Sequence, residues 1–107
     1  MSEKYLTELH KEHVAWSKNL GFYRDEIETF KHRLEEIIVR NTKTEVTAQV
    51  EHFQNQFIRQ NEVIDELLHD INAEESLIVK NAMANNVATD RRKAPENEEL
   101  VDRMKVF

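Results

Sequence analysis

The sequence of 107 residues contains no cysteine, a single glycine and a single proline. Without cysteine the chain has no disulfide framework, no thiol nucleophile and no zinc–thiolate site, and a reducing compartment is the default expectation. So few turn-forming residues exclude a many-stranded β fold, and we expect an all-α protein. Hydrophobic residues make up 39% and charged residues 34%, which suits long helices around one narrow core rather than a large catalytic domain.

Long hydrophobic runs and a surplus of basic charge are also missing. No stretch approaches the ~18 consecutive apolar residues of a membrane span, and residues 1–5 lack the features of a secretory signal. We therefore expect a cytoplasmic protein that does not contact a membrane. The net charge is −6, and the single basic cluster, Arg91-Arg92-Lys93, is too short for the basic stripe that binds phosphates. We expect no nucleic-acid partner.

Residues 2–40 carry a row of mostly apolar side chains at alternating steps of three and four. The row consists of Leu6, Leu9, His13, Trp16, Leu20, Tyr23, Ile27, Phe30, Leu34 and Ile37. This is the heptad pattern of a helix that packs along a coiled-coil-like seam. The spacing predicts one helix over 2–40, with Gly21 tolerated in its interior at a cost of about 1 kcal/mol.

A second row of the same kind follows a short break after Arg40. It consists of Val46, Val50, Phe53, Phe57, Gln60, Ile64, Leu67, Ile71, Glu74 and Ile78. Thr42 and Glu45 fit a capping box at the start of this second helix. A break this short folds two long helices back on each other, so we predict an antiparallel hairpin over 1–80. Its register pairs Phe30 with Phe53 and Tyr23 with Gln60.

The heptad spacing dissolves after Lys80, and we predict a loop over 81–95. Pro95 suits the first position of a third helix, and the acidic residues that follow complement the dipole of a helix N-terminus. The spacing restarts at Leu100 and predicts a short third helix over 96–107. We expect one domain, in which this helix completes a three-helix bundle or two copies of the chain complete a dimeric four-helix bundle.

The two long helices have more apolar side chains than they can bury on one another. Those outside the two rows are Val14, Phe22, Ile38, Ile58, Val63, Leu68 and Leu77. A third helix of about twelve residues covers only about a third of the hairpin. We therefore expect that a partner chain covers the rest, or that the native chain continues past Phe107.

The preferred hypothesis is a non-enzymatic helical bundle that acts by association, as a homo-oligomer, with a dimer favoured, or by binding a partner helix. The candidate contact residues are Val14, Phe22, Ile58 and Leu68. We predict no catalytic residue and no cofactor, because the three serines have no glycine-rich elbow and nothing resembles a phosphate-binding loop.

The alternative is a metal- or ligand-binding bundle. The heptad places His13 on the seam, level with Ile71 and near Glu74, and the candidate ligands are His10, His13, Asp70 and Glu74. Residues 66–69 also have the Glu-x-x-His spacing of di-iron bundles, although such a site needs this motif twice. A seam histidine beside a carboxylate is more typical of a hydrogen-bonded core residue that fixes the register, and we prefer that interpretation.

Four segments carry a resemblance to known proteins: Glu12-His13-Val14-Ala15-Trp16, residues 22–26, residues 49–58 and residues 64–71. Over residues 9–78 the chain resembles a group of small uncharacterised bacterial helical-bundle proteins of the Bacteroidetes type. The resemblance implies a bundle with a long C-terminal helix, from which this chain departs by ending early, and it implies no activity or cofactor. A weaker architectural likeness is to spectrin-type three-helix repeats, which also carry a Trp in the first helix.

Overall fold

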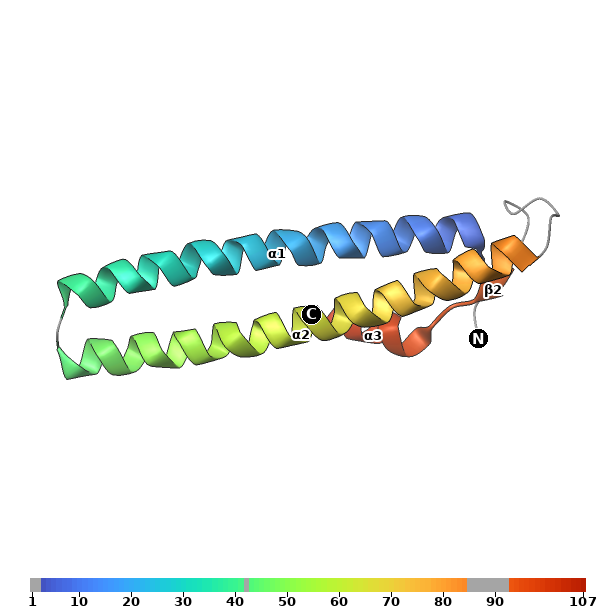
Figure 1. Cartoon of the computed structure of the whole chain (residues 1–107). Coiled ribbons are helices and arrows are strands. Elements are labelled where there is room, and N and C mark those ends of the chain that lie inside the picture. Colours follow the sequence, from blue (N-terminus) through green and yellow to red (C-terminus); the bar gives the residue numbers. More distant parts are fainter. Residues whose placement is uncertain (1–2, 42, 85–92) are drawn as a thin grey trace. The chain divides into compact units, whose positions relative to one another are not determined.

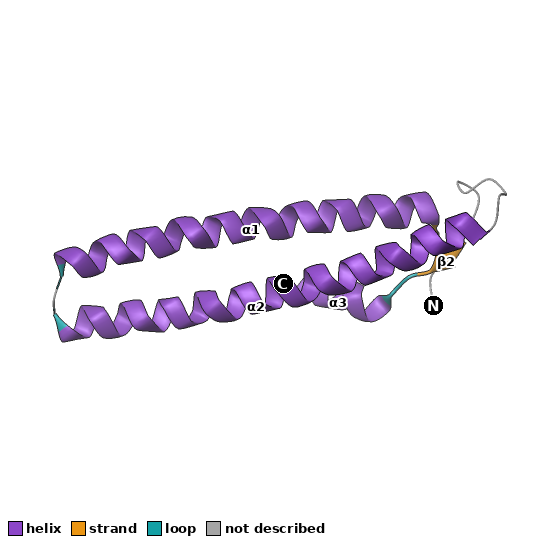
Figure 2. Ribbon diagram, viewed as in Figure 1, coloured by secondary structure: helices purple, strands orange, loops and turns teal. Residues whose placement is uncertain are grey.

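Helices make up most of the chain. The computed structural model describes residues 3–41, 43–84 and 93–107, and it shows two long antiparallel helices and a short third one (Figure 1). The described elements, in chain order, are β1 (Glu3–Tyr5), α1 (Leu6–Arg40), α2 (Thr44–Ala84), β2 (Lys93–Pro95) and α3 (Glu98–Val106). Figure 2 shows how little the two strands contribute beside the helices. The predicted all-α hairpin with a short third helix is confirmed.

The contacts between residues divide the chain into two compact units. Unit 1 comprises the described residues of Met1–Asn19 and Glu66–Phe107, and unit 2 comprises Leu20–Asp65. Unit 1 therefore contains the start of α1, the end of α2, both strands and α3. Unit 2 contains only α1 and α2 segments with their short connection, so its apolar side chains have two helices to pack on, whereas unit 1 has three. No helix in the described part of the chain is both long enough and apolar enough to span a bilayer.

The first predicted row is mostly buried in unit 1, where Trp16 is half-buried, and is only partly buried in unit 2. In unit 1, Leu6, Leu9 and His13 are buried, as the heptad pattern predicts. In unit 2, every second member of the same row is exposed instead. The exposed members are Tyr23 at 47%, Phe30 at 43% and Ile37 at 41% of their surface. The strict heptad prediction is wrong for these three residues.

The same departure occurs on α2. In unit 2, Val50 and Ile64 are buried, whereas Phe53 and Gln60 are exposed. In a straight α-helix, residues seven positions apart are offset by about 20° around the helix axis. The buried stripe therefore does not follow the predicted row, and the side chains along one edge of that row become exposed. We call the exposed edge the open row. It consists of Tyr23, Phe30 and Ile37 of α1 and Phe53 and Gln60 of α2.

The rotation also changes which aromatic side chains meet in unit 2. Phe30 stacks on Phe57, with ring centroids 6.2 Å apart and an interplanar angle of 15°, whereas the predicted register placed Phe30 opposite Phe53. Tyr23 and Gln60 are both exposed, so they do not form the predicted buried pair. Unit 2 thus buries one narrow stripe and leaves several aromatic rings half in solvent.

The N-terminal helix begins at Leu6 and not at residue 2, because the three residues before it form a strand. β1 pairs antiparallel with β2, and Lys4 lies opposite Ala94. The Nζ atom of Lys4 lies 2.7 Å from a carboxylate oxygen of Glu12 and 2.8 Å from one of Glu96. These two carboxylates, Glu12 foremost, raise the pKa of Lys4 above its ordinary value. The strand pair and this ion pair attach the segment that leads into α3 to the start of α1.

The predicted boundaries near the C-terminus also change. Helix α2 continues to Ala84, and β2 lies within the segment predicted as a loop over 81–95. Pro95 belongs to the strand, and α3 begins only at Glu98, because Asn97 provides the cap: its Oδ1 accepts a hydrogen bond of 3.1 Å from the backbone N–H of Leu100. The rest of the predicted loop, with Arg91 and Arg92, and the predicted cap Thr42 lie outside the described residues.

The packing of α3 in unit 1 is tested by Leu100→Ala. Leu100 is the fully buried side chain of α3, so we expect the substitution to lower the free energy of unfolding by about 2–5 kcal/mol. Urea unfolding at a single protein concentration measures the change. The matched control is Val106→Ala on the same helix, where the side chain is 88% exposed and the expected change is within about 0.5 kcal/mol. Equal effects of the two substitutions would show that α3 does not pack as described.

Candidate functional site

Two histidines of α1 share one carboxylate in unit 1. His10 and His13 are three residues apart and therefore lie on one face of the helix. The Nδ1 atom of His10 lies 2.9 Å from Oε2 of Glu75, and the Nδ1 atom of His13 lies 2.6 Å from Oε1 of the same residue. His13 is buried, with 5% of its surface exposed, whereas His10 is exposed. The cluster therefore connects a core position with the surface.

The charge of Glu75 holds this cluster together. Burial raises the pKa of Glu75, but the hydrogen bonds from His10 and His13, with the positive charge that these rings can carry, outweigh burial and leave the pKa below its ordinary value. An ionised carboxylate only accepts hydrogen bonds, so each imidazole donates its Nδ1–H to it. In the neutral form of His13, Nε2 is then an acceptor.

The four predicted metal-ligand candidates do not come together. Asp70 accepts a hydrogen bond of 2.5 Å from Nη1 of Arg103, and Glu74 accepts one of 2.7 Å from Nδ2 of Asn97. Both carboxylates face α3 or its cap, whereas the carboxylate beside His10 and His13 is that of the next residue on α2. His13 lies near Glu74, as expected, because both residues line one cavity, but the carboxylate that His13 contacts is that of Glu75. Among the described residues, no group of three His, Asp or Glu side chains is arranged to hold a metal ion.

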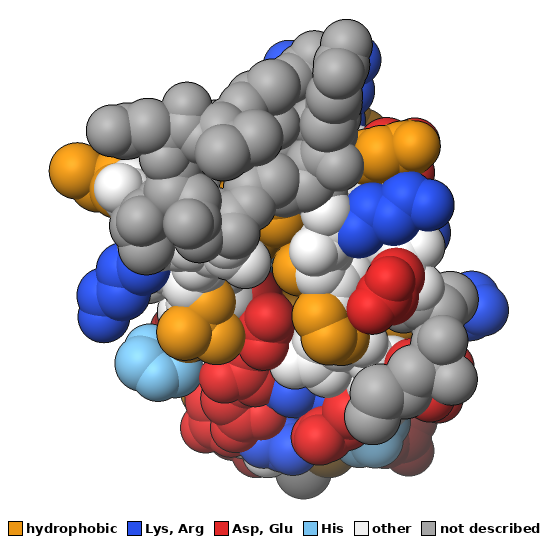
Figure 3. All heavy atoms as spheres, turned by 90° about the vertical axis from the view of Figure 1, so that its right-hand side faces the viewer, with side chains coloured by type: hydrophobic (Ala, Val, Ile, Leu, Met, Phe, Trp, Pro, Cys, Tyr) orange, Lys and Arg blue, Asp and Glu red, His pale blue; other side chains and the backbone are white. Residues whose placement is uncertain are grey.

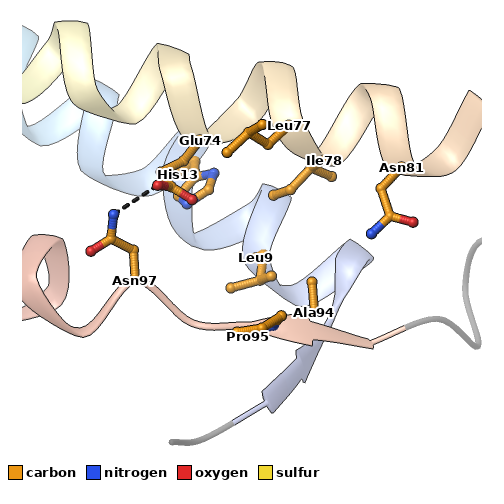
Figure 4. Close-up of a pocket in the computed structure, with 9 residues that line it drawn as sticks. All are labelled: Leu9, His13, Glu74, Leu77, Ile78, Asn81, Ala94, Pro95 and Asn97. Atoms are coloured by element: carbon orange, nitrogen blue, oxygen red, sulfur yellow. Dashed lines mark hydrogen bonds between the residues drawn. The ribbon is translucent and has the colours of Figure 1, made fainter.

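A cavity of about 370 Å³ lies beside this cluster in unit 1. Its walls come from α1, α2 and the segment that contains β2 (Figure 4). The lining residues are Leu9, His13, Glu74, Leu77, Ile78, Asn81, Ala94, Pro95 and Asn97. The side chains labelled in Figure 4 surround this space, with Ala94 and Pro95 across from Ile78. The cavity is mainly apolar, with one buried imidazole and one carboxylate in its wall.

Acidic side chains gather on the face of the molecule that Figure 3 shows. They lie beside a histidine, while lysines and arginines are placed around them. None of the described residues that line the cavity is a lysine or an arginine. The carboxylate of Glu74 in the described part of the cavity wall therefore favours a positively charged group over an anion.

The second candidate site is the open row of unit 2. Charged side chains border its exposed apolar members. Glu26 and Arg33 lie three residues after Tyr23 and Phe30, respectively, and residues three apart are neighbours on the surface of a helix. The guanidinium of Arg33 lies 5.9 Å from the centroid of the Phe30 ring, within the range of a cation–π contact. The open row thus has an apolar centre and a border with charges of both signs.

The predicted partner-contact residues divide between the two units. Phe22 and Ile58, in unit 2, are 61% and 55% exposed, and Phe22 contacts the ring of Tyr23 edge-on at 5.9 Å. Val14, in unit 1, is exposed, and Leu68 is half-buried. The sequence missed the open row as a surface, since the heptad pattern assigned its residues to the core.

No family model, curated protein or solved structure matches this chain. The resemblance to small bacterial helical-bundle proteins therefore stays an expectation.

The role of Glu75 can be tested through the pH dependence of stability. The pKa of Glu75 is lowered in the folded state. The charged carboxylate therefore stabilises the fold at pH values above the ordinary glutamate pKa, near 4.3. This contribution is lost as the pH falls through the lowered pKa. We expect Glu75→Gln to lower the free energy of unfolding by about 1–2 kcal/mol at pH 7. The difference from the unaltered chain shrinks as the pH falls below the ordinary glutamate pKa and through the lowered value, and urea unfolding at a series of pH values from neutral into the acid range measures it.

A suitable control is Glu62→Gln, which removes an exposed ion pair in which Arg59 Nη1 and Glu62 Oε2 are 3.0 Å apart. We expect it to change stability by no more than about 0.5 kcal/mol at pH 7. A deficit of Glu75→Gln that stays the same from pH 7 down to the most acidic pH at which the unaltered chain remains folded would contradict the assigned role.

Proposed function

We propose that the chain is a non-enzymatic association module that forms a homodimer through the open row of unit 2, in a cytoplasmic setting. The observation that carries the proposal is the exposure of Tyr23, Phe30 and Phe53 at positions where a helix of a bundle normally buries its residues. Full burial of one such side chain is worth about 1.5–3 kcal/mol, so leaving several of them in solvent is costly for an isolated hairpin. Exposed apolar patches of this kind mark interaction sites.

Unit 1 supports this interpretation because the equivalent row is occupied there. Leu9, a member of the α1 row, is buried and shares a cavity wall with Ala94 and Pro95 of β2. Trp16, another member, is half-buried, and it lines a second hollow together with Val101 and Met104 of α3. In unit 1 the chain thus covers this row with its own strand and third helix, whereas in unit 2 no described residue does so.

The border of the open row favours a second copy of the chain as the occupant. Glu26 and Arg33 lie seven residues apart on α1, one on each side of Phe30. A two-fold axis that passes near Phe30 brings Glu26 of one copy beside Arg33 of the other, and it does so twice. Such isologous pairing is the usual form of a homodimer, and it places opposite charges around an apolar centre. Two hairpins joined in this way form a dimeric four-helix bundle.

The apolar part of the proposed interface is tested by Phe53→Glu. A charge at this exposed position leaves the buried stripe of unit 2 intact but places carboxylates in the apolar centre of the dimer. We expect the dissociation constant to rise by at least a hundredfold, with unchanged helix content in circular dichroism. Light scattering over a range of micromolar concentrations measures the first, and Val39→Glu, at an exposed position outside the open row, serves as the control.

The charged border is tested by exchanging its signs. Glu26→Arg and Arg33→Glu each place like charges together in the dimer, and we expect each to weaken it about tenfold, equivalent to about 1.4 kcal/mol. The double variant restores the opposite pairing and should dimerise as the unaltered chain does. Sedimentation velocity at low salt measures all four proteins. A double variant weaker than either single variant, or an unaltered chain that stays monomeric at all concentrations, would overturn the proposal.

A further inference from the structure

The cavity in unit 1 combines an apolar wall with hydrogen-bond acceptors. Leu9, Leu77, Ile78, Ala94 and Pro95 supply the apolar part. A volume of about 370 Å³ falls within the range of sites that hold small molecules, roughly 300–1,000 Å³. A ligand here buries a short hydrocarbon chain against these side chains.

His13 supplies the first acceptor. Its Nδ1 is engaged with Glu75, which does not line the cavity. Its Nε2 makes no hydrogen bond to any described residue. This atom is nevertheless accessible to solvent, because it is absent from the described buried polar atoms that lack a hydrogen-bond partner. The side chain is only 6% exposed and forms part of the cavity wall, so the cavity is where this atom meets solvent. A buried imidazole with its Nδ1–H held by a carboxylate thus offers the lone pair of Nε2 to a donor in the cavity.

Glu74 supplies the second acceptor and a negative charge. Its Oε1 accepts the hydrogen bond from Asn97, and its Oε2 makes no hydrogen bond or ion pair with the described part of the chain. Among the described residues of the cavity wall there is no lysine or arginine to neutralise this carboxylate. An anionic ligand is therefore disfavoured, and a ligand that donates several hydrogen bonds and carries positive charge is favoured.

We propose that this cavity binds a primary alkylammonium ion. The ammonium group has three N–H donors and no acceptor, so it matches the carboxylate of Glu74 and Nε2 of His13. The alkyl chain lies against the apolar residues around Ile78 and Ala94. This site lies wholly in unit 1 and does not depend on dimer formation through unit 2.

The test uses n-hexylammonium chloride as the probe, titrated into the 107-residue chain at pH 7.5 and followed by two-dimensional amide NMR. We expect saturable shifts of amide signals around Leu9, Ile78 and Ala94, with a dissociation constant on the order of 1 mM for a ligand of this size. Sodium hexanoate has the same chain length but the opposite charge, and it should bind at least tenfold more weakly. Methylammonium chloride lacks the alkyl chain and should give no saturable shifts.

Two variants locate the probe. Glu74→Gln keeps an oxygen that accepts from Asn97 but removes the charge, and we expect it to weaken hexylammonium binding at least tenfold. Ala94→Leu fills the cavity and should abolish binding. Glu51→Gln removes an exposed carboxylate of α2 in unit 2 and should leave binding unchanged.

Each result decides the proposal. It is overturned if hexylammonium causes no saturable shifts, if hexanoate binds equally well, or if Glu74→Gln binds as the unaltered chain does. Since Ala94→Leu alters a strand, its spectrum must show dispersed signals before its loss of binding counts, and the Glu74→Gln result stands without it.

Discussion

Two helices packed side by side can bury only one stripe of side chains on each other, and this constraint governs the molecule. Each long helix carries a wider apolar band than such a stripe, so one edge of the band needs a further element to cover it. In unit 1, β2 and α3 lie over that edge, and Leu9 is buried there. In unit 2, the corresponding edge is the open row, where Tyr23, Phe30 and Phe53 are half in solvent.

The cover of unit 1 is built from short polar and backbone contacts as well as from packing. β1 pairs with β2 through backbone hydrogen bonds, Asn97 caps α3, and Arg103 contacts Asp70. Because a strand and a nine-residue helix are thinner and shorter than a full-length third helix, they leave a cavity beside His13. The small size of the covering elements in unit 1 thus accounts for its candidate ligand site.

The two long helices could be predicted from the sequence, whereas the side chains that contact one another across them could not. The two long helices follow from a period that persists over ten positions, and the antiparallel turn follows from the short break between them. The strand pair was missed because three residues are too few to show a period, and α3 was started too early because Pro95 gave a stronger helix signal than Asn97. Glu75 was missed in favour of Glu74 because a strict heptad ignores the slow rotation of a straight helix, which decides the face of a residue several turns away.

The central claim is that the open row is a surface that a second copy of the chain covers. Hydroxyl-radical footprinting at two protein concentrations, well below and well above the dimer dissociation constant, tests it at the level of single side chains. The account predicts that Tyr23, Phe30 and Phe53 are readily oxidised in dilute solution and protected in concentrated solution, while Trp16 in unit 1 reacts equally in both. Equal oxidation of all four side chains at both concentrations, in samples whose mass shows a dimer at the higher one, would contradict it.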